Sequence, residues 1–323
     1  MNKFVFFGGK GGVGKTTVSS AFGLKCAREG MRTLLVSTDP AHSTSDVFDQ
    51  QFDDDPAAVE GHENLFAMEL DPDEEVKRHM RDIKSSMTDQ VSPAIVNEID
   101  RQIELAHRTP GAYEAALFDR FIDVMRSSDD YDRVVFDTSP TGGTLRLLAL
   151  PEFLESWIER LRAKREESVD LFEKAAIGDQ EARQKLADDP ILRRLAERKE
   201  MFEFAGETLR EEAVFYLVLN PDELSIEESK RSIGELTDAG LTVGGLVVNK
   251  VAPEPEPDET GTGATYLRER HRTEQERLDR IRDEFDQPLV SVIEQRVSEI
   301  KDDLLSEVSD ELTIETAASP PEI

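Results

Sequence analysis

The chain has 323 residues and a formal net charge of −30, because 69 acidic residues outnumber 39 basic ones. Such a charge argues against a surface for nucleic acid or an anionic membrane, since both would need basic patches. The single cysteine, Cys26, excludes a disulfide within the chain and a cluster of thiolates on one metal ion. No apolar run approaches the roughly 20 residues that span a bilayer. The N-terminus leads directly into an apolar segment, so we expect a cytoplasmic protein without a signal peptide or a membrane span.

The basic residues are mostly arginine, with 26 arginines and 13 lysines. Few lysines and many carboxylates are typical of halophilic proteins, in which salt screens the repulsion between like charges. A very acidic surface for a protein partner is the alternative. Because the acidic residues are spread along the whole chain, we favour the halophilic interpretation.

Short apolar segments rich in Val, Leu and Phe predict the strands of a parallel sheet. The first is Phe4–Phe7, and after a glycine-rich loop a helix is expected over Thr17–Ala27. The further predicted strands are Thr33–Ser37, Leu65–Leu70, Arg133–Phe136, Ala213–Leu219, Leu246–Asn249 and Leu289–Val292. Helical patterns separate most of them, as crossover connections require. The sequence therefore predicts an α/β fold, whose ligands bind at the carboxyl ends of the strands.

Two long, charged, helical segments interrupt this alternation, at residues 73–128 and 151–210. They predict an α-helical subdomain inserted into one domain that spans residues 1–323. The proline-rich and acidic stretch at 253–263 predicts a flexible loop. A disordered tail is expected over about 315–323.

Residues 8–17 read GGKGGVGKTT, and within them Gly9 to Thr16 fits the phosphate-binding loop pattern. The loop follows a predicted strand and precedes a predicted helix, which is the context that the motif requires. Its backbone N–H groups would surround phosphate oxygens at a helix N-terminus. Lys15 would bridge the β- and γ-phosphates, and the Thr16 hydroxyl would hold Mg²⁺. The candidate ligands of ATP are Gly9, Gly11, Gly12, Val13, Gly14, Lys15, Thr16 and Thr17.

With Lys15, the candidate catalytic residues are Lys10 and Asp39, and the candidate Mg²⁺ ligands are Thr16, Asp39 and Asp137. Lys10 is a second lysine inside the motif, where an ordinary phosphate loop needs none. Asp137 ends an apolar strand, as an Mg²⁺-binding aspartate of the Walker B type does. Asp39 lies in a proline-containing turn after the second strand, where it could orient the attacking water. The alternatives are a solvated lysine for Lys10, a cap at the strand end for Asp137 and an Asx turn for Asp39.

These motifs together resemble the ArsA and guided-entry ATPase family, whose phosphate loop is the deviant Walker A type. The resemblance is carried by residues 8–17, by Asp39-Pro40-Ala41-His42-Ser43, by 109–115, by Asp137–Pro151, by Asn220-Pro221 and by the region of Asn249. It implies a P-loop ATPase in which Lys10 reaches the nucleotide of the second subunit of a homodimer. It also implies that Asp39 positions the hydrolytic water beside Mg²⁺, that Asp137 serves Mg²⁺, and that Asn220 and Asn249 bind the nucleotide, Asn249 through adenine.

The chain departs from this family's pattern in three places. Gly143 stands where many relatives have histidine. The paired cysteines that bind zinc across the dimer in targeting members are missing before Tyr266, so no zinc is expected. The three cysteines that bind arsenite in pump ATPases are missing as well, because Cys26 is alone.

An apolar stripe at helical spacing in the first helical segment is the candidate client surface. Its methionines suit a surface that binds varied apolar partners, although packing against other helices of the subdomain is the alternative. The stripe consists of Val76, Met80, Ile83, Met87, Val91, Ile95, Ile99 and Ile103.

The resemblance therefore implies a homodimeric ATPase that captures hydrophobic, tail-anchored membrane-protein segments and delivers them. A membrane receptor or a pump subunit is expected as a further partner. An ATPase subunit that drives an arsenite or anion efflux pump is the first alternative, and the missing cysteines count against it. The second alternative is a spatial regulator of partition or cell division that shares the deviant loop. The acidic composition and the helical insertion disfavour it.

Overall fold

The structure is a computed structural model that describes residues 2–38, 43–71, 112–137, 156, 159–160, 163 and 190–316. Asp39 and the apolar stripe of Val76–Ile103 lie outside these described residues. The strands are β1 (Phe4–Gly8), β2 (Thr33–Ser37), β3 (Ala57–Ala58), β4 (Leu65–Glu69), β5 (Arg133–Asp137), β6 (Ala213–Leu219), β7 (Val243–Val251) and β8 (Leu289–Glu294). The helices are α1 (Lys15–Arg28), α2 (Ser43–Phe48), α5 (Ala112–Arg126), α9 (Pro190–Glu211), α10 (Glu223–Asp238), α11 (Thr262–Glu284) and α12 (Asp302–Glu311).

The described strands form one sheet in the order β3-β4-β2-β5-β1-β6-β7-β8. Every strand pair is parallel except the outermost one, in which β3 runs antiparallel to β4. All seven predicted strands are present, and the helix expected over Thr17–Ala27 is α1. The sequence did not predict β3, because two residues are too few to show a strand periodicity. The predicted α/β class is confirmed.

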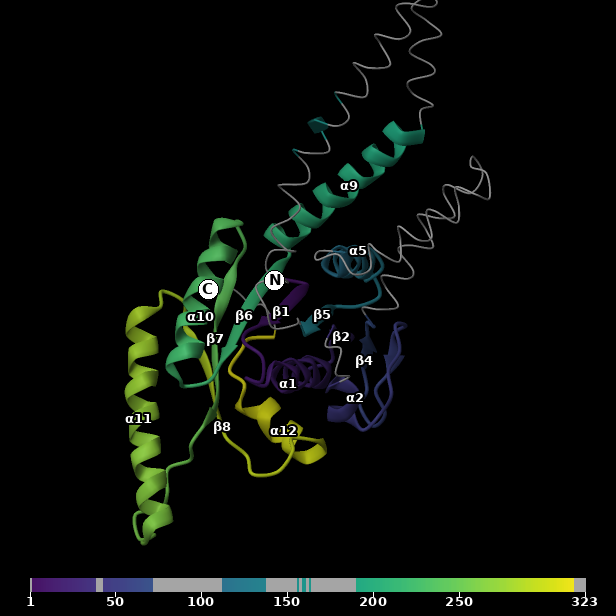
Figure 1. Ribbon diagram of the computed structural model, residues 1–323. Helices are drawn as coiled ribbons and strands as arrows, with labels where there is room; N and C mark the ends of the chain where they lie inside the picture. The colour runs from purple at the N-terminus through teal and green to yellow at the C-terminus, as the bar shows by residue number, and fades with distance from the viewer. Residues whose placement is uncertain are drawn as a thin grey trace, which may run out of the picture.

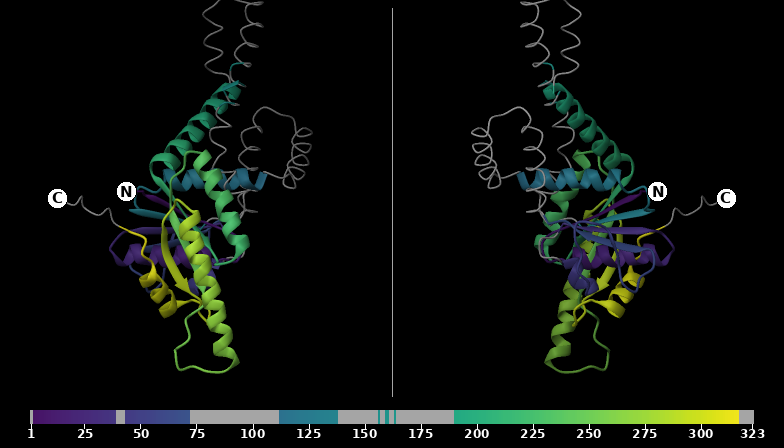
Figure 2. Two further views of the ribbon diagram at one scale, coloured as in Figure 1. Left: turned by 90° about the vertical axis from the view of Figure 1, so that its left-hand side faces the viewer. Right: turned by 90° about the vertical axis from the view of Figure 1, so that its right-hand side faces the viewer.

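Helices cover both faces of the sheet (Figures 1 and 2). Phe4 and Phe6 of β1 join a core cluster with residues of α5, α9, α10 and α11. Val5 and Phe7 point to the other face and join a cluster with residues of α1, α2 and α12. Since neighbouring side chains of a strand point to opposite faces, a strand buried on both faces reads as a continuous apolar run. That is why the central strands were visible in the sequence.

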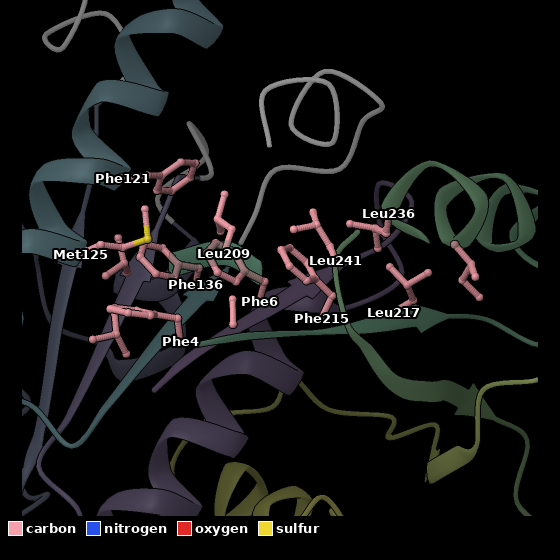
Figure 3. Close-up of a cluster of buried hydrophobic side chains, with 14 of the residues drawn as sticks. Phe4, Phe6, Phe121, Met125, Phe136, Leu209, Phe215, Leu217, Leu236 and Leu241 are labelled. Carbon is pink, nitrogen blue, oxygen red and sulfur yellow. The ribbon is translucent and has the colours of Figure 1, made fainter. Parts of the chain in front are cut away.

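Aromatic rings fill the core beneath α5 (Figure 3). The Phe6 ring stacks on Phe136 of β5 and on Phe215 of β6, with centroid distances of 4.5 and 4.7 Å. Phe121 of α5 meets Phe136 edge to face at 5.2 Å. Each of these rings is at most 2% exposed. Burial of a phenylalanine side chain contributes on the order of 1.5–3 kcal/mol, so this stack ties three strands and α5 together next to the phosphate loop.

The two predicted helical segments are described only near the sheet. Phe118 of α5 stacks on Phe202 of α9, and both rings are buried in the cluster that covers the sheet. α9 continues away from the sheet (Figure 1). The rest of 73–128 and 151–210 lies almost entirely outside the described residues, so the inserted subdomain stays a prediction.

The C-terminal segment is anchored to α1 and β5. Lys25 of α1 donates a hydrogen bond to the backbone oxygen of Leu312, and Arg133 donates one to that of Thr316 at 2.7 Å. The Thr316 hydroxyl donates to Glu29. The chain is therefore held to the core as far as Thr316, and residues 317–323 of the predicted tail lie outside the described ones.

The stretch before α11, predicted to be flexible, contains a turn closed by Glu259 N and Glu256 O at 3.1 Å. Arg268 of α11 donates to both backbone oxygens of this turn, at 3.0 Å to Glu256 and 2.6 Å to Glu259. Among the helices that the structure describes, none is both long and apolar enough to cross a membrane.

Candidate functional site

The carboxyl ends of β2, β5, β1, β6 and β7 lie side by side at one edge of the sheet. Phe7 of β1 is level with Asp137 at the end of β5. The register of β6 and β7 places Asn220 and Asn249 at neighbouring positions, where the paired part of both strands ends. Parallel α/β sheets bind ligands at this edge, so the fold brings the phosphate loop, Asp137 and both asparagines around one candidate site.

Two glycines allow the phosphate loop to pass close to the neighbouring strands. Gly9 has a φ of +143°, and a Cβ atom there would lie 2.1 Å from the backbone oxygen of Val218. Gly14 has a φ of +92°, and a Cβ atom there would lie 2.3 Å from Nδ2 of Asn249. A Cβ atom at Gly9 would collide with a backbone oxygen of the sheet, and one at Gly14 would displace the buried amide of Asn249. The loop therefore requires glycine at both positions for backbone conformation and for space.

The N-terminus of α1 suits an anion. α1 begins at Lys15 with Gly14 as its N-cap, which makes no side-chain capping hydrogen bond, and its first turn contains no acidic residue. The partial positive charge of the first N–H groups is therefore directed at the loop. Lys15 is only 9% exposed, and its Nζ donates to the backbone oxygen of Lys10 at 3.4 Å. A cationic side chain, a helix N-terminus and a glycine loop together form a phosphate site.

Oxygen ligands for a metal ion lie beside this phosphate site. The Thr16 hydroxyl, in the first turn of α1, lies 3.0 Å from the hydroxyl of Ser43, which begins α2. Asp137 is 1% exposed, and its backbone oxygen accepts from Thr38 N at 3.3 Å. Mg²⁺ prefers oxygen ligands and is commonly held by one or two protein oxygens together with phosphates and water. The residues therefore fit Mg²⁺ in the presence of a nucleotide. The described residues contain no group of three or more His, Cys, Asp or Glu that would hold a metal alone.

Two residues near the end of β7, Asn249 and Lys250, hydrogen-bond to the outside of the phosphate loop. Asn249 is buried, its Nδ2 donates to the backbone oxygen of Val13 at 2.8 Å, and its Oδ1 accepts from Lys250 N at 2.9 Å. Lys250 has a φ of +60° and extends its Nζ to the backbone oxygen of Gly12 at 2.6 Å. Two successive loop carbonyls are thus bound from outside. Because the C=O and N–H groups of a peptide unit point in opposite directions, these contacts favour inward-facing N–H groups.

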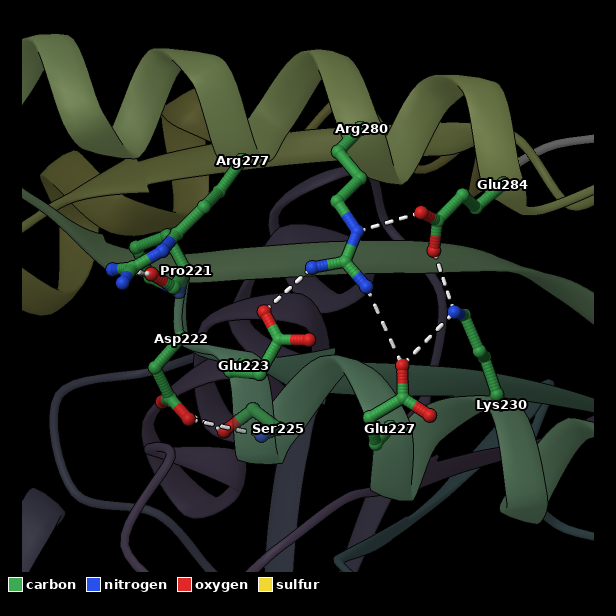
Figure 4. Close-up of polar contacts among 9 residues, drawn as sticks. All are labelled: Pro221, Asp222, Glu223, Ser225, Glu227, Lys230, Arg277, Arg280 and Glu284. Atoms are coloured by element: carbon green, nitrogen blue, oxygen red, sulfur yellow. Dashed lines mark hydrogen bonds and ion pairs between the residues drawn. The ribbon is translucent and has the colours of Figure 1, made fainter.

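Asn220 directly follows β6, and the two residues after it, Pro221 and Asp222, are held by hydrogen bonds to α11 and α10 (Figure 4). The backbone oxygen of Asn220 accepts from Asp222 N at 2.8 Å, and the Asp222 side chain caps α10 by accepting from Ser225 N at 2.9 Å. Arg277 of α11 donates to the backbone oxygen of Pro221 at 2.8 Å. The Oδ1 atom of Asn220 is buried and accepts no hydrogen bond from the residues that the structure describes. A buried acceptor of this kind is suited to an N–H donor of a ligand.

Comparison with known proteins identifies the family of this chain. A sequence model described as "Anion-transporting ATPase" matches residues 2–313, nearly the whole chain. The chain belongs to the anion-transporting ATPase family. As a member of this P-loop family it is an ATP hydrolase, and the glycine loop with Lys15 and Thr16 is the part of the site that fits the phosphates of ATP.

Relatives of this ATPase carry two kinds of name. "Putative arsenical pump-driving ATPase 2" of Aquifex aeolicus is 35% identical over 281 residues, which are 87% of this chain and 88% of that protein. "ATPase GET3A" of Arabidopsis thaliana is 34% identical over 282 residues, 86% of this chain and 74% of that protein. "ATPase ASNA1 homolog 1" of Paramecium tetraurelia is 34% identical over 264 residues, 77% of this chain and 75% of that protein. All three names describe an ATPase, and of these three only the name of the Aquifex aeolicus protein says what the ATPase drives, an arsenical pump.

The structure of this ATPase brings together most of the predicted site residues and adds two. The loop, Thr16, Asp137, Asn220 and Asn249 share the carboxyl edge of the sheet, whereas Asp39 lies outside the described residues. The Lys10 side chain is partly exposed and makes no hydrogen bond or ion pair with the described part of the chain. Lys250 and Ser43 were not predicted. Lys250 follows Asn249 within β7, but only the distance from its Nζ to the backbone oxygen of Gly12 reveals its contact with the loop.

Proposed function

We propose that this ATPase works as a homodimer that captures hydrophobic, tail-anchored membrane-protein segments when ATP is bound and releases them after hydrolysis. The proposal is supported by the similarity to the proteins named GET3A and ASNA1 homolog 1 over three quarters or more of the chain. It is also supported by the resemblance of the loop and switch segments to guided-entry ATPases. The proposed cofactors are ATP and Mg²⁺, and the proposed partners are a second copy of the chain, client segments and a membrane receptor.

The observation that favours this function over an arsenite pump is the state of Cys26. It is the only cysteine of the chain, and its side chain is completely buried on α1. Burial raises the pKa of its thiol to about 12, so it stays protonated at neutral pH. A three-thiolate site for As(III) needs exposed, ionisable cysteines. An efflux pump remains the second candidate function, because the relative from Aquifex aeolicus bears that name.

We propose the following roles at the nucleotide. Lys15 and the first turn of α1 neutralise the β- and γ-phosphates, and Thr16 and Asp137 hold Mg²⁺ directly or through water. Mg²⁺, when bound, offsets the negative charge that develops on the transferred phosphoryl group. Asn220 and Asn249 lie toward the base, where the buried Oδ1 of Asn220 would accept from the adenine amino group. Asp39 orients the attacking water.

The partly exposed Lys10 supports the homodimer. Its ammonium group makes no ion pair within the described chain, so phosphates of a nucleotide in a facing subunit could bind it. ATP would then favour closure more strongly than ADP, because a ligand shifts two states only by the difference in its affinity for them. Closure would bring the stripe of Val76–Ile103 in each subunit into one apolar groove.

Crosslinking tests the capture of clients. A transmembrane-helix peptide with a photoreactive group is offered to the full-length protein with a non-hydrolysable ATP analogue. We expect crosslinks within Val76–Ile103, which are lost in Lys10→Ala and in the Met80→Asp/Met87→Asp variant. Lys301→Ala, a change of the same charge at the N-cap of α12, should crosslink as the unmodified protein does. The proposal is wrong if crosslinks fall elsewhere or survive both changes.

The rate of ATP turnover tests the proposed role of Asp39 in positioning the attacking water. Asp39→Asn should keep ATP affinity within a few fold and lower turnover by on the order of 10² or more. Normal turnover in this variant would contradict the assignment.

Arsenite or antimonite should leave the ATPase rate unchanged. A dose-dependent rise that disappears in Cys26→Ala would favour the pump instead.

A further inference from the structure

A buried carboxylate outside the phosphate loop holds the beginning of α2. Glu69 ends β4 and is 3% exposed. Its Oε1 accepts from Thr44 N and from Ser45 N, both at 2.9 Å, and its Oε2 accepts from the Ser45 hydroxyl at 2.8 Å. A buried carboxylate is costly unless it is well hydrogen-bonded. Three charge-assisted hydrogen bonds of this length are strong, so they fix the first turn of α2 to the sheet.

The residue immediately before this fixed turn reaches the proposed metal site. Ser43 precedes Thr44, and its hydroxyl lies 3.0 Å from the hydroxyl of Thr16. Glu69 is level with Ser37 in the register of β4 and β2, so β4 is itself held against the strand that leads to this site. The Ser45 hydroxyl also accepts from Phe52 N at 3.2 Å, which secures the far side of α2. The Ser43 hydroxyl is thereby held in place opposite Thr16.

We propose that Ser43 and Glu69 are positioning residues for the Mg²⁺ ligand Thr16. A threonine hydroxyl that binds a metal through its oxygen retains its proton and needs an acceptor for it. Ser43 is that acceptor, and Glu69 sets its position by holding α2. The bond fixes the rotation of the Thr16 hydroxyl and would leave its oxygen available to Mg²⁺, as hydrogen-bond partners of metal ligands generally do. This inference rests on the proposed Mg²⁺ site.

Nucleotide binding with and without the metal tests it. Affinity of the full-length protein for a non-hydrolysable ATP analogue is measured by calorimetry in Mg²⁺ and in EDTA, together with the Mg²⁺ concentration that gives half-maximal ATPase activity. In Ser43→Ala and Glu69→Gln we expect that Mg²⁺ concentration to rise by about tenfold. The affinity gained from Mg²⁺ should fall by a similar factor, whereas affinity in EDTA changes less than about twofold.

Two further variants separate positioning from a general loss of structure. Ser43→Thr keeps the hydroxyl and should restore the Mg²⁺ response. Glu60→Gln removes the same charge from an exposed position of the same region and should leave the response as it was. If Glu69→Gln does not fold, Ser43→Ala still tests the positioning role, because it removes only one hydroxyl. Equal losses with and without Mg²⁺, or unchanged Mg²⁺ responses, would overturn the inference. An unmodified protein that gains no affinity from Mg²⁺ would overturn the metal site itself, and this inference with it.

Discussion

Gly14→Ala tests whether the end of β7 holds the phosphate loop in place. Gly14 has a φ of +92°, and an L-residue in the left-handed region costs about 1–2 kcal/mol. Its new Cβ atom would also lie 2.3 Å from Nδ2 of Asn249, which must then move. The displaced amide would lose its hydrogen bond to Val13 O, at a cost of about 1 kcal/mol. The sum is about 2–3 kcal/mol, or about a 30- to 150-fold weaker affinity for ATP if the loop must regain this shape to bind.

The assay combines calorimetric titration with ATP and chemical unfolding, because the loop already has this shape without nucleotide. The cost is therefore divided between a lower free energy of unfolding and weaker binding, and their sum is the predicted quantity. Gly12→Ala is the matched control, since its φ is +80° and a Cβ atom there meets nothing within 4 Å. It should cost only the backbone strain, about 1–2 kcal/mol.

A double-mutant cycle isolates the collision with Asn249. In an Asn249→Ala background the amide is gone, so Gly14→Ala should cost no more than Gly12→Ala does. Residues in contact are expected to be non-additive in this way. If the effects of Gly14→Ala and Asn249→Ala simply add, the close approach of these two residues does not hold the loop, and our reasoning fails.

Three further predictions follow from single contacts. Lys250→Met should weaken ATP binding by about fivefold, because it removes one exposed hydrogen bond to Gly12 O worth about 1 kcal/mol. Lys230→Met is the control, and identical ATP titration curves for Lys250→Met and the unmodified protein would exclude this contribution. Phe121→Ala should lower the free energy of unfolding by about 3–5 kcal/mol, since the ring is 1% exposed, and a smaller loss in denaturant titration would mean that α5 is not part of the core. Cys26 should react with a thiol reagent at pH 8 only after unfolding. Because the folded thiol keeps its proton up to about pH 12 while the unfolded one loses it near 9, the protein should lose stability between these values relative to Cys26→Ala, and identical pH profiles would contradict this.

The sequence predicted the fold well where the signals were local. The central strands are buried on both faces, so each is a continuous apolar run that needs no knowledge of its neighbours. The phosphate loop is encoded within ten consecutive residues, 8–17, and its function follows from backbone geometry. The edge strand Ala57–Ala58 escaped notice, because it is defined by pairing with β4 rather than by its own composition.

The candidate site was predicted only in part, because some of its residues follow a local pattern and others are defined only by contacts with distant segments. Asp137 and Asn249 could be found because each directly follows an apolar run of the sequence. A contact of Asn249 with adenine was predicted from the resemblance to a family and stays a prediction, whereas its hydrogen bond to Val13 was not predicted. Neither Ser43 nor Glu69 belongs to a spacing pattern that would assign it to Thr16.

By itself, the sequence determined the class of the fold, the phosphate loop and the strand ends where polar residues gather, because each depends on residues within a few positions of one another. Only the tertiary structure decided the strand order and which side chains brace the loop. The Asn249–Val13 bond joins residues 236 positions apart, and the Arg133–Thr316 bond joins residues 183 apart. Such contacts arise when the sheet places distant strand ends side by side, and no local pattern of residues encodes that placement.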